Sequence, residues 1–146
     1  MKDMQEIESG YIGRDTDDCG IVTTLTDVEI ISTSGTNVIA RGRRFGRFWL
    51  LKGIIPRLRE SSSARRRLQK EFELHSRLLH PNIVRVAALE DIPSLGTCIV
   101  EEWVEGETLA TLLRSGQLSK GDRRRILREI IYAVGYMHSM GVVHRD

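Results

Sequence analysis

The sequence predicts an α+β fold, in which a five-stranded antiparallel sheet carries one helix between its third and fourth strands. Two observations lead to this prediction. Short segments rich in β-branched residues, separated by turn residues, stand on both sides of one segment with helical periodicity. After Gly106 the pattern is helical only, which is typical of an α+β lobe that leads into a second, helical lobe. The chain of 146 residues is long enough to bury a core.

Three strands are expected first, after a polar leader that occupies residues 1–27. Their expected ranges are 28–31, 37–43 and 47–55, with turns at 33–36 and 42–46. In the second strand, Val38 and Ala40 share a face. In the third, the alternation of side chains places Leu50 and Lys52 on one face and Leu51 on the other.

A single helix is expected over residues 65–79, capped by Ser62 or Ser63. Its apolar arc consists of Leu68, Phe72, His75, Leu78 and Leu79. Glu71 falls inside this arc, whereas Glu73 points about 200° away from Glu71 at about 100° per residue. We therefore expect Glu71 to face the sheet and Glu73 to face solvent.

Two further strands and two helices complete the pattern. The strands are expected at 85–92 and 97–104, joined by a turn at 93–96, and the helices at 108–113 and 119–139. Ser119 and Asp122 form a capping box at the start of the long helix. Its inward stripe is Ile126, Leu127, Ile130, Ala133, Val134 and Met137. The predicted domain division is 28–104 for the first lobe and 105–146 for the start of the second.

Composition excludes several classes of protein. The net charge of +2 is too small to indicate a polyanionic partner. Cys19 and Cys98 are far apart and fit neither a disulfide scaffold nor a metal knuckle, so a reducing, cytoplasmic location is expected. No segment approaches the roughly 18 apolar residues of a membrane span, and no His/Cys cluster has metal-ligand spacing.

Four short segments, in order, carry a resemblance to a known family. They are Trp49-Leu50-Leu51-Lys52, Glu71 ahead of His80-Pro81-Asn82, the run from Ile99 to Gly106, and His144-Arg145-Asp146. Together they resemble the eukaryotic-type protein kinase family of the serine/threonine type, from Val28 to Asp146. The resemblance implies the ATP-binding N-terminal lobe of a kinase, truncated at the H-R-D of its catalytic loop.

The resemblance also implies roles for individual residues. Lys52 would bind the α- and β-phosphates of ATP, Glu71 would hold Lys52, and Asp146 would accept the proton of the substrate hydroxyl. Arg145 would pair with a phosphorylated activation segment. The implied nucleotide contacts are Gly35, Val38, Leu50, Glu101, and the backbone of Glu102 and Val104. The implied cofactors are ATP and Mg²⁺, with the Mg²⁺ ligands beyond Asp146.

Three departures from the family pattern count against tight ATP binding. Gly35 is the one glycine left of the expected glycine-rich loop, Leu50 replaces a small residue over the adenine, and Glu101 replaces an apolar residue or Thr behind the pocket. The truncation predicts a chain that is inactive by itself, needs its missing C-terminal lobe to act on a protein substrate, and self-associates through its exposed long helix.

Two alternatives remain open on the sequence. The first is a pseudokinase or scaffold that keeps the fold for protein contacts. The second is a basic nucleic-acid-binding module, suggested by Arg41, Arg43, Arg44, Arg47 and the arginine triplets at 65–67 and 123–125. Sparse aromatic residues and balancing acidic ones make the second the weaker alternative, so no nucleic-acid or membrane partner is expected.

Overall fold

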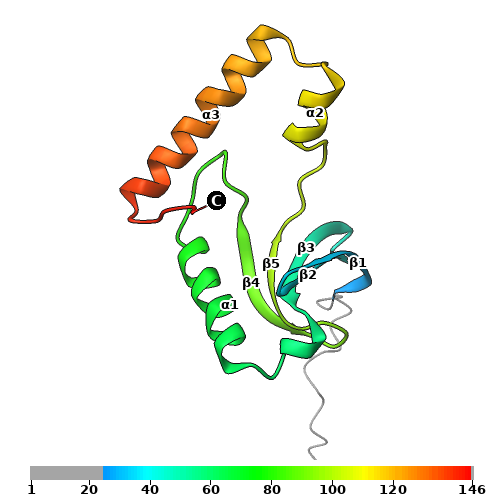
Figure 1. Cartoon of the computed structure of the whole chain (residues 1–146). Coiled ribbons are helices and arrows are strands. Elements are labelled where there is room, and N and C mark those ends of the chain that lie inside the picture. Colours follow the sequence, from blue (N-terminus) through cyan, green and yellow to red (C-terminus); the bar gives the residue numbers. More distant parts are fainter. Residues whose placement is uncertain (1–24, 146) are drawn as a thin grey trace, which may run out of the picture.

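The computed structural model describes residues 25–145, which form a five-stranded antiparallel sheet and three α-helices (Figure 1). The elements are β1 (Thr26–Ser34), β2 (Asn37–Arg44), β3 (Arg47–Ile54), a short 3₁₀ turn η1 (Pro56–Leu58), α1 (Ser62–His75), β4 (Val86–Ile92), β5 (Gly96–Glu102), α2 (Leu109–Ser115) and α3 (Lys120–Ser139). The strand order is β1-β2-β3-β5-β4, with every neighbouring pair antiparallel. The predicted fold class is confirmed.

The two faces of the sheet pack against different partners. On one face, the predicted pair Val38 and Ala40 joins Leu51, Cys98 and Val100 in a core that is almost fully buried. Gly53 is required there, because a Cβ atom at this position would lie 2.7 Å from the Cys98 sulfur. This close approach keeps β3 tight against β5.

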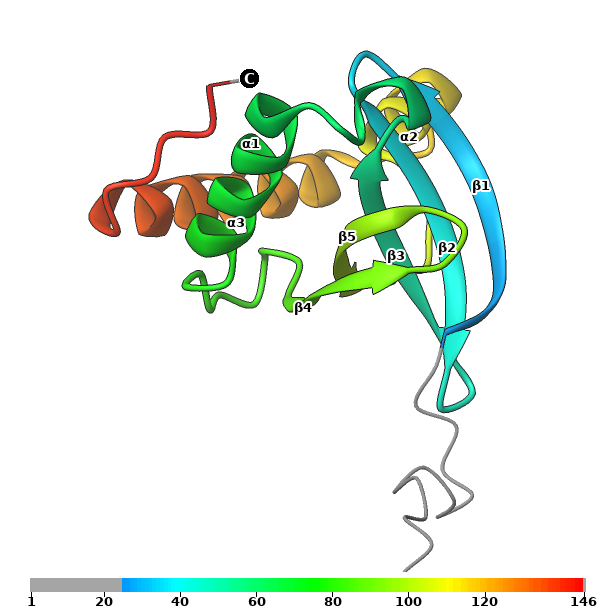
Figure 2. The ribbon, with the colours of Figure 1, turned by 90° about the horizontal axis from the view of Figure 1, so that it is seen from below.

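On the other face, α1 covers the centre of the sheet. Ala64 and Leu68 from α1 pack with Ile54 of β3 and Ile99 of β5. Figures 1 and 2 show α1 and α3 on the same side of the three strands β1, β2 and β3. The face that carries α1 is the face on which Lys52 lies.

The limits of α1 differ from the predicted ones. Its N-cap is Ser61, whose side chain accepts a hydrogen bond from the Ala64 backbone N–H, so the helix begins earlier than expected. It ends at His75, after which the chain turns through a hydrogen bond from the Leu78 N–H to the His75 carbonyl. Leu79 is therefore outside the helix and 68% exposed, and its predicted place in the apolar arc was wrong.

The long helix α3 matches its predicted limits and its capping box at Ser119 and Asp122. Its stripe is buried only in part: Ala133 and Met137 are buried, whereas Leu127 is 59% exposed and Ile130 45% exposed. The segment that follows α1 contacts the C-terminal half of α3, where the Tyr136 hydroxyl accepts a hydrogen bond from the Leu79 N–H and the Tyr136 ring stacks on His80. Within residues 25–145, no helix combines the length and the apolar character that crossing a membrane requires.

Candidate active site

Lys52 and Glu71 meet between β3 and α1, as the sequence predicted. The Lys52 ammonium donates a hydrogen bond to the Glu71 carboxylate, and the two groups form an ion pair. Their side chains are 24% and 40% exposed, so the pair lies at the edge of the core and faces open space on one side. Glu73 instead accepts a hydrogen bond from Gln69 on the exposed surface of α1, as expected from its angular position.

Strand register identifies which residues share the face of Lys52. In an antiparallel pair, residues directly opposite each other point to the same face. Ile39 lies opposite Lys52, and Leu50 lies between Arg41 on β2 and Glu101 on β5. Leu50 and Glu101 therefore accompany Lys52, as predicted.

The prediction for Val38 needs correction. Val38 pairs with Gly53 and is 2% exposed in the core on the opposite face of the sheet. It has no access to a ligand that contacts Lys52. Ile39, its half-buried neighbour, occupies the position on the Lys52 face.

Gly35 lies in the tight turn between β1 and β2. Its φ of +57° is a left-handed conformation that favours glycine, and a Cβ atom there would meet no neighbour. A small hollow of about 140 Å³ beside this turn is lined by Thr36 and Asn37 on one side and by Arg67 and Glu71 of α1 on the other. The turn and the Lys52–Glu71 pair thus border the same side of the sheet.

Glu101 is engaged by a residue that sequence reasoning did not connect with it. The Nδ1 atom of His75 lies 3.5 Å from a Glu101 carboxylate oxygen, and its Nε2 atom lies 2.8 Å from the Val84 carbonyl oxygen. The hydrogen bond with Glu101 is the main cause that raises the pKa of His75, and burial opposes it. The sequence did carry one indication of this position: His75 stands one helical turn after Glu71, so the two side chains share a face of α1.

The chain leaves β5 through the segment that was predicted to contact adenine. The Glu102 N–H donates a 2.9 Å hydrogen bond to the Arg85 carbonyl, which fixes the end of the strand. Val104 follows the strand and is 63% exposed. Trp103 between them donates its indole N–H to Glu105 at 2.9 Å and lies 6.3 Å from the Phe48 ring.

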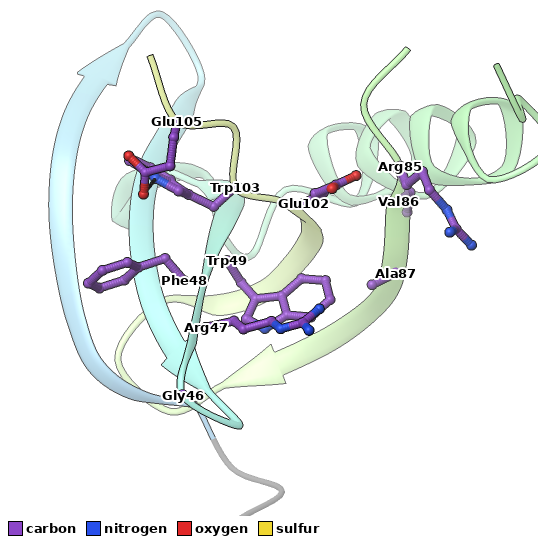
Figure 3. Close-up of a pocket in the computed structure, with 10 residues that line it drawn as sticks. All are labelled: Gly46, Arg47, Phe48, Trp49, Arg85, Val86, Ala87, Glu102, Trp103 and Glu105. Atoms are coloured by element: carbon purple, nitrogen blue, oxygen red, sulfur yellow. Dashed lines mark hydrogen bonds between the residues drawn. The ribbon is translucent and has the colours of Figure 1, made fainter. Parts of the chain in front are cut away.

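A larger hollow of about 580 Å³ lies near the same strand ends (Figure 3). Its central side chain is Trp49, which points to the face of Leu51 and away from that of Lys52 because side chains alternate along β3. Arg47, Arg85 and Glu102 also line it. This hollow is separate from the Lys52–Glu71 pair, and we assign no nucleotide to it.

The predicted catalytic-loop residues stand at the end of the described chain. After α3 the backbone runs back toward α1 (Figures 1 and 2). His144 and Arg145 are exposed. Asp146 lies outside the described residues, and its role stays a prediction.

Comparison with known proteins places these features in a family. The family model for the protein kinase domain matches residues 33–146. Serine/threonine-protein kinase 36 of Pongo abelii is 30% identical over 120 residues, which are 82% of this chain and 9% of that protein. Myosin light chain kinase A of Dictyostelium discoideum is 32% identical over 79 residues, which are 54% of this chain and 27% of that protein. The chain thus spans about a quarter or less of these relatives.

Solved structures show the same fold. The crystal structure of Rad53 in complex with AMP-PNP superposes with a TM-score of 0.65 and 28% sequence identity, covering 84% of this chain and 32% of the other. The kinase domain of PknI from Mycobacterium tuberculosis superposes with a TM-score of 0.62 at 24% identity, over 84% of this chain and 52% of the other. With a family model that matches most of its length, this chain belongs to the protein kinase domain family.

Proposed function

We propose that this chain is the nucleotide-binding part of a serine/threonine protein kinase whose complete form transfers the γ-phosphate of ATP to hydroxyl groups of a protein substrate. The observation that carries the proposal is the ion pair between Lys52 and Glu71. A lysine that follows two leucines on a strand, matched by a carboxylate on the helix above, is difficult to explain by packing alone, since charges taken from water require compensation.

Each residue near this pair has a proposed task. Lys52 places a fixed positive charge on the phosphates of ATP, and Glu71 keeps the lysine in position. The backbone around Gly35 borders the phosphates, while Leu50 and Ile39 offer apolar surface on the same face. Backbone groups of Glu102 and Val104 hold the adenine. ATP, bound with Mg²⁺, supplies the phosphoryl group and the metal charge that offsets the charge of its phosphates.

The remaining parts of the proposal concern the rest of the protein. Asp146 orients the substrate hydroxyl, Arg145 pairs with a phosphorylated segment, and the Mg²⁺ ligands lie beyond Asp146. The chain by itself is inactive and self-associates through the exposed stripe of α3 until a C-terminal lobe covers it. A cytoplasmic location stays a prediction.

A scaffold without catalysis is the second candidate, and two observations favour it. Gly35 is explained by its turn conformation alone, and Glu101 is occupied by His75 instead of leaving an apolar pocket wall. The nucleic-acid alternative is weaker, because its arginines are distributed over β2, β3, α1 and α3.

A calorimetric titration with Mg-ATP separates these candidates. It uses the longest natural form of the protein that contains this chain, together with Lys52→Ala and the control Lys70→Ala. Lys70 is an exposed lysine on α1, so the control removes the same charge away from the site. A hydrogen bond to a charged group contributes about 1.5–3 kcal/mol, so Lys52→Ala should weaken binding by about ten- to a hundredfold.

Either of two results would contradict the kinase proposal. Absence of binding in the unmodified protein would favour the scaffold. Equal weakening by Lys52→Ala and Lys70→Ala would show that Lys52 does not contact the phosphates.

A further inference from the structure

The C-terminal half of α1 is attached to the sheet mainly through polar contacts. The buried residues of this helix, Ala64 and Leu68, both lie in its first half. Phe72 in the second half is only partly buried. Glu71 and His75, one turn apart on the same face, both make ionic contacts with the strands.

The two contacts reach adjacent central strands. Glu71 binds Lys52 on β3, and His75 contacts Glu101 on β5. Glu101 lies directly opposite Leu50, two residues from Lys52 and on the same face. One turn of α1 is therefore joined to β3 by Glu71 and to β5 by His75. A movement of this turn that breaks one contact also shifts the residue that makes the other.

We propose that His75 and Glu101 are positioning residues, whose contact fixes the end of α1 on β5 and thereby holds Glu71 against Lys52. The contact is largely shielded from solvent, because the Glu101 side chain is only 14% exposed and the His75 side chain 22%. A carboxylate in that setting needs a partner, and His75 supplies it. The importance of this contact for phosphoryl transfer rests on the proposed function.

The surroundings of His75 favour the form in which both ring nitrogens are donors. Nε2 faces the Val84 carbonyl, and Nδ1 faces the Glu101 carboxylate. Both partners accept hydrogen bonds, and a neutral imidazole has only one N–H to donate. The imidazolium form satisfies both contacts, whereas the neutral form would turn a lone pair toward one of the two oxygens.

The contact should therefore weaken as pH rises. The charged groups that act on His75 are Glu101 from β5 and Glu71 from α1, while β3 contributes Lys52, which already binds Glu71. On the side of β4, the neighbouring group is the neutral carbonyl of Val84. Glu101 first, then the Val84 carbonyl and Glu71, raise the pKa of His75 above 6.5, against the opposing effect of burial. The stabilisation is complete below that ordinary pKa and is lost as pH rises through the raised one.

Two measurements on the longest natural form of the protein test the proposal without nucleotide. The first is hydrogen exchange of the last turn of α1, where the Ser76 N–H is bonded to the Phe72 carbonyl at 2.8 Å. The second is the acylation rate of Lys52 relative to that of the exposed Lys70, by mass spectrometry. The variants are His75→Ala and the isosteric Glu101→Gln, with Glu73→Gln as the control that removes a charge from the exposed side of α1.

Both variants should raise exchange of this turn and the Lys52 acylation ratio by roughly three- to tenfold, the range expected for one partly buried charged contact. In the unmodified protein the acylation ratio should rise with pH through the titration of His75, and Glu101→Gln should reduce this dependence. His75→Gln, which keeps a donor toward one oxygen, should recover part of the protection.

The result that overturns the proposal is exchange and Lys52 labelling in Glu101→Gln equal to those in Glu73→Gln, with an unchanged pH dependence. If His75→Ala fails to fold, Glu101→Gln still decides the outcome. If the variants respond as expected but Mg-ATP does not bind, the proposed function fails while the positioning contact stands. If Mg-ATP binds and the variants match the control, the positioning contact fails and the proposed function stands.

Discussion

Replacing Glu71 by Gln removes the negative charge that faces Lys52 while keeping the size and shape of the side chain. The two side chains are 24% and 40% exposed, so solvent screens part of their attraction. A charged hydrogen bond contributes about 1.5–3 kcal/mol when well shielded and an exposed pair about 1 kcal/mol or less. We therefore expect a loss of about 1–1.5 kcal/mol, which corresponds to roughly five- to tenfold weaker binding of Mg-ATP.

The assay is a calorimetric titration of Glu71→Gln beside Glu73→Gln, which makes the same chemical change two residues away. Glu73 bonds to Gln69 on the exposed surface, so its replacement should alter binding by less than about twofold. A double-mutant cycle of Glu71→Gln with Lys52→Met, measured by urea unfolding without nucleotide, should give a coupling free energy near 1 kcal/mol.

Equal effects of the two glutamate variants would show that the carboxylate facing the sheet contributes nothing particular to the binding of Mg-ATP. A coupling free energy near zero would show that the ion pair does not order Lys52. In that case binding of Mg-ATP would have to be explained without Glu71.

Two further predictions concern stability and assembly. Glu90→Gln should lower the free energy of unfolding at neutral pH by about 1–2 kcal/mol, because Glu90 accepts two hydrogen bonds from Arg44 and these lower the pKa of its carboxyl from 4.5. This contribution to stability is present above that ordinary pKa and is lost as pH falls through the lowered one. Urea-unfolding curves of the variant and the unmodified protein should therefore converge in acid, and a difference that persists there would contradict the prediction. The double variant Ile130→Ser and Leu127→Ser should shift this chain toward the monomer in analytical ultracentrifugation, because both side chains lie on the exposed stripe of α3. The control Ile31→Ser, on the edge strand β1, should leave the association unchanged. Unchanged association of the double variant would contradict the role given to α3.

The elements with strong local signals were predicted closely. The limits of α3 followed from its capping box, since Ser119 and Asp122 satisfy backbone groups that only a helix start leaves free. The start of α1 was missed because Ser61, Ser62 and Ser63 are chemically equivalent caps, and only the packing of Ala64 and Leu68 decides among them. Propensity cannot resolve a choice among equal residues.

Predictions that depended on register or on distant contacts were less successful. The pairing of Val38 with Ala40 on one face was correct, but the resemblance that made Val38 a nucleotide contact did not fix the β2–β3 register. That register is set across the turn at Phe45 and Gly46, both with positive φ, and it puts Val38 on the face opposite Lys52. The Lys52–Glu71 contact was implied by the resemblance to the kinase family, and helical periodicity independently placed Glu71, not Glu73, toward the sheet. The contact of His75 with Glu101 was not predicted, because helical spacing put His75 toward the sheet but did not identify Glu101 as its partner.

The two halves of α1 are held by different forces, and this matters for the candidate site. Burial of Ala64 and Leu68 fixes the first half against Ile54 and Ile99, a contact that depends little on salt or pH. The second half depends on the ion pairs of Glu71 and His75. Salt screens both pairs, and the pair of His75 also weakens as pH rises. A helix fixed by its core at one end and by charges at the other can change its angle without unfolding. The position of Glu71 relative to Lys52, on which the proposed phosphate contact depends, therefore relies more on charge than the position of the first half of α1 does.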